Sequence, residues 1–357
     1  MPTRFMHPRP SSIVAALYTA RDLEVDVAIL HGPSGCSFKH ARLLEEDGMR
    51  VLTTALADNE FIFGGQKALE NVLRYAEKQF KPKRMAVIGT CVSMIIGEDL
   101  AAAIDSAGIA TPIIAVDIHA GFTENIAGVL STLDAASQAG WISEEELARQ
   151  HRLMGKANEV EKLRGAASQE YLEPLRGDLK HVAGQRLLAC AWSGAKGVAI
   201  LNAKKETAYM FADELIALHD TCPEADITYI ANVDNRGLPK VRADAGRIRD
   251  EMTRRGVPLE VIGALDEYGA KGDALGTRIR EIAPSFALIA GVPHAIPPEY
   301  TNGIECFSVT NGPRQVAPLH VIGHEHVLVE IDLHPKTLGV CDIVESEFGA
   351  VLRSLTR

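Results

Sequence analysis

Short apolar runs alternate with longer amphipathic segments along most of this 357-residue chain. Buried strands of a parallel sheet read as short apolar runs, and the helices that connect them read as longer segments with one apolar face. Strands are therefore predicted at residues 25–31, 50–54, 84–90, 112–118, 186–192, 226–232, 258–263, 286–291, 305–310 and 326–333. Helices are predicted at residues 39–48, 66–79, 94–107, 123–136, 203–218, 242–255, 270–282 and 345–356. This alternation predicts an α/β protein with Rossmann-like, doubly wound parallel sheets.

The chain is too long for one typical hydrophobic core, so two or three domains are expected. Residues 143–180 are charged and lose the strand pattern, which is typical of one or two exposed helices that bridge two halves. We expect an N-terminal Rossmann-like domain over residues 1–180 and a C-terminal Rossmann-like region over residues 181–357. A division of the second region near residue 285 is an open alternative.

Composition narrows the class of protein. Hydrophobic residues make up 46% of the chain and charged residues 24%, with a net charge of −10. This balance is ordinary for a globular protein and gives no electrostatic footprint for nucleic acid. No apolar run approaches the roughly 20 residues of a membrane span, and the first residues lack the apolar stretch of an export signal. We therefore expect a cytoplasmic protein without nucleic-acid or membrane partners.

Cys36 and Cys91 each follow a predicted strand, and both lie among glycines. Because ligands of parallel sheets bind beyond the carboxyl ends of the strands, the two thiols are expected to converge on one site. Two thiolates are half of a four-cysteine iron–sulfur site, so this interpretation requires a symmetric partner. A C-x-x-C motif is absent, which argues against a zinc ribbon or a ferredoxin-type cluster run.

The other cysteines have a structural interpretation. Cys190, Cys306 and Cys341 occupy apolar runs and are expected to be small buried hydrophobes, whereas Cys222 precedes a proline in a loop. The chain contains no G-x-x-x-x-G-K-[ST] motif for nucleotide phosphates. If the chemistry needs ATP, another polypeptide is expected to bind it.

Four segments in a fixed order carry a resemblance to a known family: 31–36 (HGPSGC), 58–65 (DNEFIFGG), 88–91 (IGTC) and 96–99 (IGED). Their order, spacing and glycine positions resemble the nitrogenase component 1 superfamily, the cluster-bearing partner of an ATP-hydrolysing iron protein. The two-lobed pattern extends this resemblance over most of the chain. The resemblance implies a nitrogenase component 1-like fold.

Departures from the nitrogenase pattern select a branch of the superfamily. Nitrogenase subunits offer a third cysteine between the two positions, but residues 37–90 contain none. This compact form is similar to the homodimeric catalytic components of the nickel-sirohydrochlorin a,c-diamide reductive cyclases. That resemblance implies one 4Fe-4S cluster per homodimer, bound by Cys36 and Cys91 of each protomer. It also implies an iron-protein-like ATPase reductase as partner, with ATP and magnesium on that partner only.

The implied reaction is a six-electron reduction of the nickel tetrapyrrole together with closure of a lactam ring, a step toward the nickel coenzyme of methanogenic archaea. Two other functions stay open. One is a subunit of a dark-operative chlorophyll-precursor reductase, and the other is a non-catalytic scaffold for metal-cofactor assembly.

Further side chains are candidates for proton transfer and substrate binding. Asp117 and His119 end a predicted strand at the same sheet edge as the cysteines, so they are candidates for proton transfer. Cationic partners for substrate carboxylates are expected in loops of the C-terminal region, the predicted wall of the substrate cavity: Lys196, Arg236, Lys240 and Arg314. Histidines that could donate protons or bind nickel crowd the last quarter of the chain: His294, His320, His324, His326 and His334.

Overall fold

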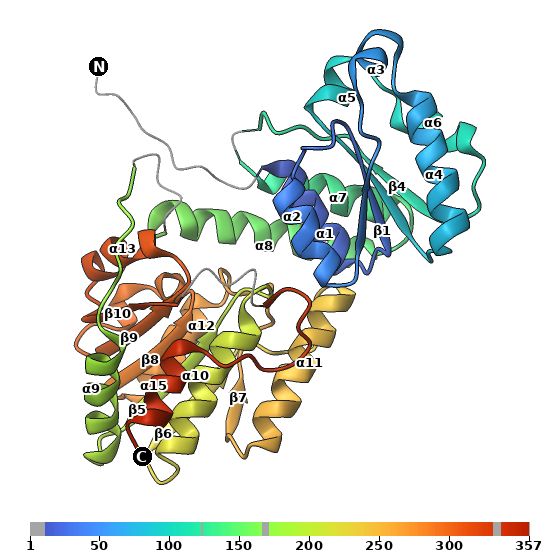
Figure 1. Ribbon diagram of the computed structural model, residues 1–357. Coiled ribbons are helices and arrows are strands. Elements are labelled where there is room, and N and C mark those ends of the chain that lie inside the picture. Colours follow the sequence, from blue (N-terminus) through green and yellow to red (C-terminus); the bar gives the residue numbers. More distant parts are fainter. Residues whose placement is uncertain (1–10, 123, 166–170, 331–336, 357) are drawn as a thin grey trace, which may run out of the picture. The chain divides into compact units, whose positions relative to one another are not determined.

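The computed structural model describes residues 11–122, 124–165, 171–330 and 337–356 (Figure 1). The chain divides into two compact units. The N-terminal unit contains Pro8–His151 and Leu238–Lys240, and the C-terminal unit contains Arg152–Gly237 and Val241–Arg357. The division falls within helix α8 (Glu144–Leu163), whereas the sequence pattern placed the boundary after residue 180. None of the helices in the described part of the chain has both the length and the apolar character that a bilayer crossing requires.

The N-terminal unit is built on a four-stranded parallel sheet with the order β2-β1-β3-β4. Its strands are β1 (Val27–His31), β2 (Arg50–Thr53), β3 (Met85–Gly89) and β4 (Ile113–Val116). Its helices are α1 (Ser12–Asp22), α2 (Phe38–Glu46), α3 (Asp58–Phe63), α4 (Gln66–Phe80), α5 (Cys91–Ile95), α6 (Leu100–Ala107) and α7 (Ile126–Gln138). Apolar side chains of α4 and α6 pack on one face of the sheet, while α1 and α7 pack on the other (Figure 1). The predicted doubly wound arrangement is confirmed for this unit.

The C-terminal unit contains a six-stranded parallel sheet with the order β10-β9-β8-β5-β6-β7. Its strands are β5 (Gly197–Asn202), β6 (Ile227–Ala231), β7 (Leu259–Val261), β8 (Phe286–Gly291), β9 (Glu305–Thr310) and β10 (His326–Val329). The chain runs outward from β5 to β7 and then returns to β8 on the other side of β5. The carboxyl ends of β5 and β8 therefore border the topological switch point, where open α/β sheets bind ligands.

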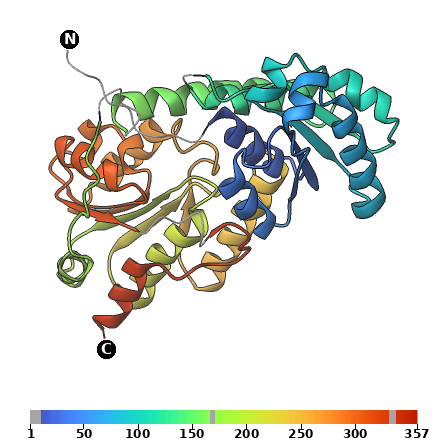
Figure 2. The ribbon, with the colours of Figure 1, turned by 45° about the horizontal axis from the view of Figure 1, so that its top comes forward.

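Helices cover both faces of this sheet. They are α9 (Lys180–Trp192), α10 (Ala208–Thr221), α11 (Pro239–Arg254), α12 (Gly272–Ile282), α13 (Val316–Val321) and α15 (Glu347–Ser354), with short 3-10 turns η1 (Pro293–Ala295), η2 (Pro298–Tyr300) and η3 (Pro313–Gln315). Helices α10 and α15 lie side by side on one face (Figure 2). Apolar residues of α12 pack against β5 and β8 from the other. Because β8, β9 and β10 complete the same sheet, the residues after about 285 do not form a separate layer.

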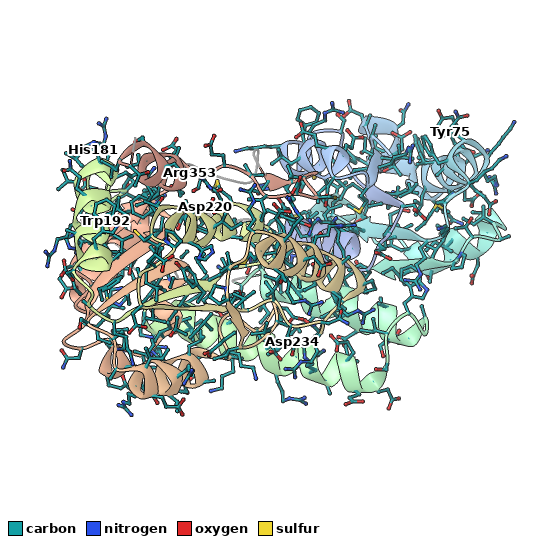
Figure 3. All side chains as sticks on the ribbon, turned by 90° about the horizontal axis from the view of Figure 1, so that it is seen from below. Tyr75, His181, Trp192, Asp220, Asp234 and Arg353 are labelled. Carbon is teal, nitrogen blue, oxygen red and sulfur yellow. The ribbon has the colours of Figure 1, made fainter. Side chains whose placement is uncertain are left out.

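The strand predicted at residues 186–192 is wrong, because these residues form the second half of α9. The run Leu187–Trp192 is apolar throughout, and a short apolar run does not distinguish a strand from a buried helical segment. In the structure Leu187, Leu188 and Ala191 are buried, while Trp192 is exposed on α9 (Figure 3). The fully buried strand that begins the second sheet is β5, which the sequence pattern missed.

Two acidic side chains are buried close enough to interact: Glu214 on α10 and Glu330 directly after β10. Glu214 is fully buried, and neither of its carboxylate oxygens has a hydrogen-bond partner among the described residues. Glu330 is also buried, with its carboxylate accepting the backbone N–H of Phe348 at 2.8 Å. Burial, and then the charges of Glu330 and Asp213, raise the pKa of Glu214 well above its ordinary value. Glu214 is therefore held as the neutral acid in the folded protein over a wide pH range.

Replacement of this acid should change how stability depends on pH. A carboxyl whose folded pKa is raised stabilises the fold fully below its unfolded pKa, and this contribution is lost as the pH rises through the folded value. Glu214→Gln should therefore raise the melting temperature relative to the natural chain. This rise should be larger at about pH 8 than at about pH 5. Glu224→Gln, at an exposed position, is the control. An equal effect of Glu214→Gln at both pH values would contradict the assignment.

Candidate functional site

The structure brings Cys36 and Cys91 to the same edge of the N-terminal sheet. Strands β1 and β3 are neighbours, with His31 paired to Gly89 at their carboxyl ends. Cys36 lies in the turn after β1, and Cys91 is the first residue of α5, directly after β3. Both thiols are half-buried. Burial raises the pKa of Cys36, and a negative charge on Cys91 raises it further, so the two sulfur atoms are near enough to interact electrostatically.

A close contact between Gly32 and Thr90 joins the loops that carry the two cysteines. The Thr90 hydroxyl donates to the backbone carbonyl of His31 at 2.9 Å. A Cβ atom at Gly32 would lie only 2.3 Å from Thr90 Oγ1, so this position accepts no side chain without movement. The glycine after β1 therefore lets the two loops approach each other.

Hydrogen bonds of His31 and Glu98 hold the same loops in place. His31 is fully buried, with Nδ1 at 3.1 Å from Thr54 Oγ1 and Nε2 at 3.3 Å from Glu98 Oε2. The other carboxylate oxygen of Glu98 accepts the backbone N–H of Gly65 at 2.5 Å. Burial lowers the pKa of His31, although Glu98 partly opposes this shift. Glu98 therefore connects three of the four segments that carry the family resemblance.

The loop after β4 folds over Cys91. The backbone N–H of Ala120 donates to Cys91 Sγ at 3.2 Å. His119 stacks on Phe122 with ring centroids 4.4 Å apart, and its Nδ1 accepts the N–H of Gly121 at 3.0 Å. Asp117 is exposed and its carboxylate faces the backbone of Gly89. Asp117 and His119 therefore lie at the cysteine edge, where the sequence placed them. The N–H donor to sulfur was missed, because a backbone contact has no residue signature.

Exposed apolar side chains surround this edge, one set after each of the four strands. We call them the apolar rim: Phe38 after β1, Phe61, Ile62 and Phe63 on α3 after β2, Met94 and Ile95 on α5 after β3, and Phe122 after β4. Phe63 is 84% exposed and Ile95 is 75% exposed. Large apolar side chains gathered at one edge mark a surface that another molecule covers.

The cations predicted for substrate binding have mixed placements. Lys196 is exposed and precedes β5, so it lies at the amino edge of the sheet, away from the carboxyl ends where it was expected. Arg236 lies in the loop after β6, as predicted, and pairs at 2.6 Å with Asp234, which is labelled in Figure 3. Arg314 follows β9 and donates to the Leu172 carbonyl at 3.1 Å. Lys240 pairs with Asp47 at 3.3 Å in the N-terminal unit.

The four remaining cysteines differ in how far they are buried. Cys306 is buried in β9, as expected. Cys222, in the loop before a proline, is also buried. Cys341 is exposed and Cys190 is half-buried on α9, so the predicted burial is wrong for Cys341 and holds only in part for Cys190.

Loss of the Glu98 brace should weaken the N-terminal unit. Glu98→Ala leaves the Gly65 N–H and buried His31 without their acceptor, at an expected cost of about 1–3 kcal/mol in the free energy of unfolding. Urea denaturation measures this change. Glu98→Gln is the matched variant, since its amide oxygen can still accept from Gly65 while its NH₂ group donates to the His31 ring, and it should recover much of the loss. An alanine variant as stable as the natural chain would show that the brace contributes nothing.

Comparison with known proteins identifies the family to which the chain belongs. Residues 11–163 match the family described as nitrogenase component 1 type oxidoreductase. The chain is 53% identical to component CfbD of the Ni-sirohydrochlorin a,c-diamide reductive cyclase complex of Methanosarcina acetivorans, over 99% of this chain and 97% of that protein. The proteins of the same name from Methanothermobacter thermautotrophicus and Methanocaldococcus jannaschii are 47% and 42% identical, over 98% and 97% of this chain and 98% of each relative. The chain therefore belongs to the nitrogenase component 1 type oxidoreductases, in the group of the CfbD components.

Proposed function

We propose that this protein is the catalytic component of a nitrogenase-like reductive cyclase that acts on Ni-sirohydrochlorin a,c-diamide. The observation that carries this proposal is the similarity to three CfbD components over 97–99% of the chain. The paired thiols at one sheet edge supply a place for the redox centre that such a reaction needs. The reaction we propose is a six-electron reduction of the macrocycle, with closure of an acetamide side chain into a lactam.

The donor set at the cysteine edge fits one half of a 4Fe-4S site. Such a cluster takes four thiolates. Within the described residues of one chain, no three metal-ligating side chains gather. Two protomers would together supply the full set, with Cys36 and Cys91 from each. When bound, the cluster would supply electrons one at a time at low potential.

The surrounding residues suit this role. Cys91 already accepts the N–H of Ala120, and hydrogen bonds to sulfur are one of the means by which a protein sets a cluster's potential. The apolar rim would exclude water from a site enclosed between two protomers. Asp117 and His119 stand on the loop that covers Cys91, where each could pass a proton to a reduced substrate.

The same proposal assigns ATP hydrolysis to a separate iron-protein-like reductase. The chain has no P-loop motif, so the energy of ATP would enter through that partner. The relatives' names describe a complex, which accords with a division of labour between chains.

The decisive experiment combines metal analysis with reconstitution. Protein purified without oxygen should hold about four iron and four sulfide per dimer. With its reductase partner, ATP, reductant and substrate it should yield the cyclised product. Cys36→Ala and Cys91→Ala should each lose the iron and the activity, whereas Cys341→Ala, at an exposed position, should keep both.

Each alternative has a distinct outcome in this experiment. Transfer of an intact metal cluster to another protein, without reduction of the tetrapyrrole, would favour a scaffold for cofactor assembly. Activity only after mixing with a different catalytic subunit would favour the heteromeric chlorophyll-precursor reductases. A full iron content in Cys91→Ala would disprove the ligand assignment.

The apolar rim should be required for the homodimer. Ile95→Asp places a charge beside Cys91 on the rim, so burial between two protomers would become unfavourable. We expect this variant to sediment as a monomer and to lose its iron. Val321→Asp, 85% exposed on α13, is the matched control and should remain dimeric. A dimeric Ile95→Asp variant with full iron would place the interface elsewhere.

A further inference from the structure

Three charged or titratable side chains meet at the topological switch point of the C-terminal sheet. Glu161 comes from α8, Lys204 follows β5, and His294 lies in η1 after β8. Lys204 Nζ is 2.8 Å from Glu161 Oε1, and His294 Nε2 is 3.5 Å from Glu161 Oε2. We call these three residues the switch-point cluster. It lies in the C-terminal unit and is separate from the cysteine edge.

The backbone at the switch point is held tightly. Gly291 ends β8 with a φ of +111°, and a Cβ atom there would lie 2.5 Å from the Asn202 carbonyl oxygen. The buried amide of Asn202 donates to the carbonyls of Tyr268 at 3.1 Å and Val292 at 3.4 Å. Arg164 donates to the carbonyl of His294 at 2.8 Å. These contacts fix the position of the His294 ring relative to Glu161.

Electrostatics hold Glu161 as a carboxylate. Burial opposes its ionisation, but the Lys204 ammonium and then His294 outweigh that effect and keep the pKa of Glu161 far below its usual range. Burial likewise disfavours charge on Lys204, whereas Glu161 raises the pKa of Lys204 well above its usual range. A permanent ion pair therefore stands beside His294. Other titratable or charged groups also face this cluster. Arg164 directly follows α8, the Tyr268 ring centroid lies 5.0 Å from Lys204 Nζ, Glu206 lies in the loop after β5, and His324 precedes β10.

His294 is only 3% exposed, yet neither ring nitrogen has a hydrogen-bond partner among the described residues. Buried polar groups are nearly always satisfied, so an exception indicates a place for a ligand or a transferred proton. The oxygen of the Asn202 amide is also unsatisfied at the same strand ends. A group that binds here would complete both.

His320, His324 and His326 each have a hydrogen-bond partner through one ring nitrogen, although Nε2 of buried His324 has none among the described residues. Burial lowers the pKa of His324 to about 4, and its Nδ1 bonds Ser308 at 2.5 Å. His326 pairs with Glu305 at 3.0 Å and stacks on Phe307. His320 bonds the backbone carbonyl of His324. His334 lies outside the described residues.

We propose that His294 transfers protons to the tetrapyrrole during its reduction, with Glu161 and Lys204 as positioning residues; this rests on the proposed function. Electrons from the reduced iron–sulfur partner add to the macrocycle. The N–H bond of the His294 imidazolium breaks, and its proton forms a C–H bond at the electron-rich ring carbon. The neutral imidazole then takes up another proton, with Glu161 Oε2 at 3.5 Å from its Nε2.

The test uses the reconstituted complex and His294→Ala. Loss of a positioned acid typically costs 10²–10⁴-fold, so kcat should fall by about 100-fold. Binding of the nickel tetrapyrrole without reductant, followed by its absorbance, should change by less than about threefold, because binding does not use the transferred proton. Added imidazole should fill the vacated space and restore part of kcat, more at low pH than at high pH. His326→Ala, which removes a stacked and paired histidine, is the matched control and should keep most of the activity.

The outcomes separate the two proposals. A natural chain that binds the tetrapyrrole but never reduces it rejects the proposed function. A natural chain that reduces it, with His294→Ala at full rate or beyond rescue by imidazole, rejects the proton-transfer role alone. Glu161→Gln adds a second criterion, since it should lower kcat and change the pH profile of kcat.

Discussion

The parallel pairing of β1 with β3 is the constraint on which the cysteine edge depends. Parallel neighbours end at the same edge of a sheet, so the residues that follow them start a few ångströms apart. The remaining distance is closed by Gly32, which lets the Thr90 hydroxyl reach the His31 carbonyl. The carboxylate of Glu98 then holds a third segment in place. The segments that resemble the family therefore consist largely of residues that allow three loops to pack closely against one another.

Two carboxyl groups in the C-terminal unit show how neighbouring charges determine whether a carboxyl group is ionised. Glu214 is surrounded by other acids and lacks a hydrogen-bond partner in the described chain, so burial dominates and favours the neutral form. Glu161 is half-buried, and Lys204 contacts it directly, so the carboxylate is retained. The cation beside Glu161 makes the switch point a polar site, whereas the surroundings of Glu214 form part of the packing.

Most of the fold could be predicted from the sequence, because buried parallel strands have a strong apolar signal. The prediction of a strand at residues 186–192 was wrong, and β5 was missed. Two apolar runs follow each other there, and the first is a helix buried on one face whereas the second is a fully buried strand. That error also put Lys196 at the wrong edge of the sheet. The convergence of Cys36 and Cys91 could be inferred from strand ends. The cluster of Glu161, Lys204 and His294 could not, because its members are up to 133 residues apart and meet only through the strand order.

The hydrogen bond from Ala120 to Cys91 comes from the main chain. A main-chain donor survives every exchange of the side chain at its position except one to proline, which has no N–H. Alanine scanning will therefore not detect this contact. The residue type at position 120 can change without loss of the hydrogen bond to the Cys91 sulfur. What must be preserved is the path of the loop, and that depends on its neighbours.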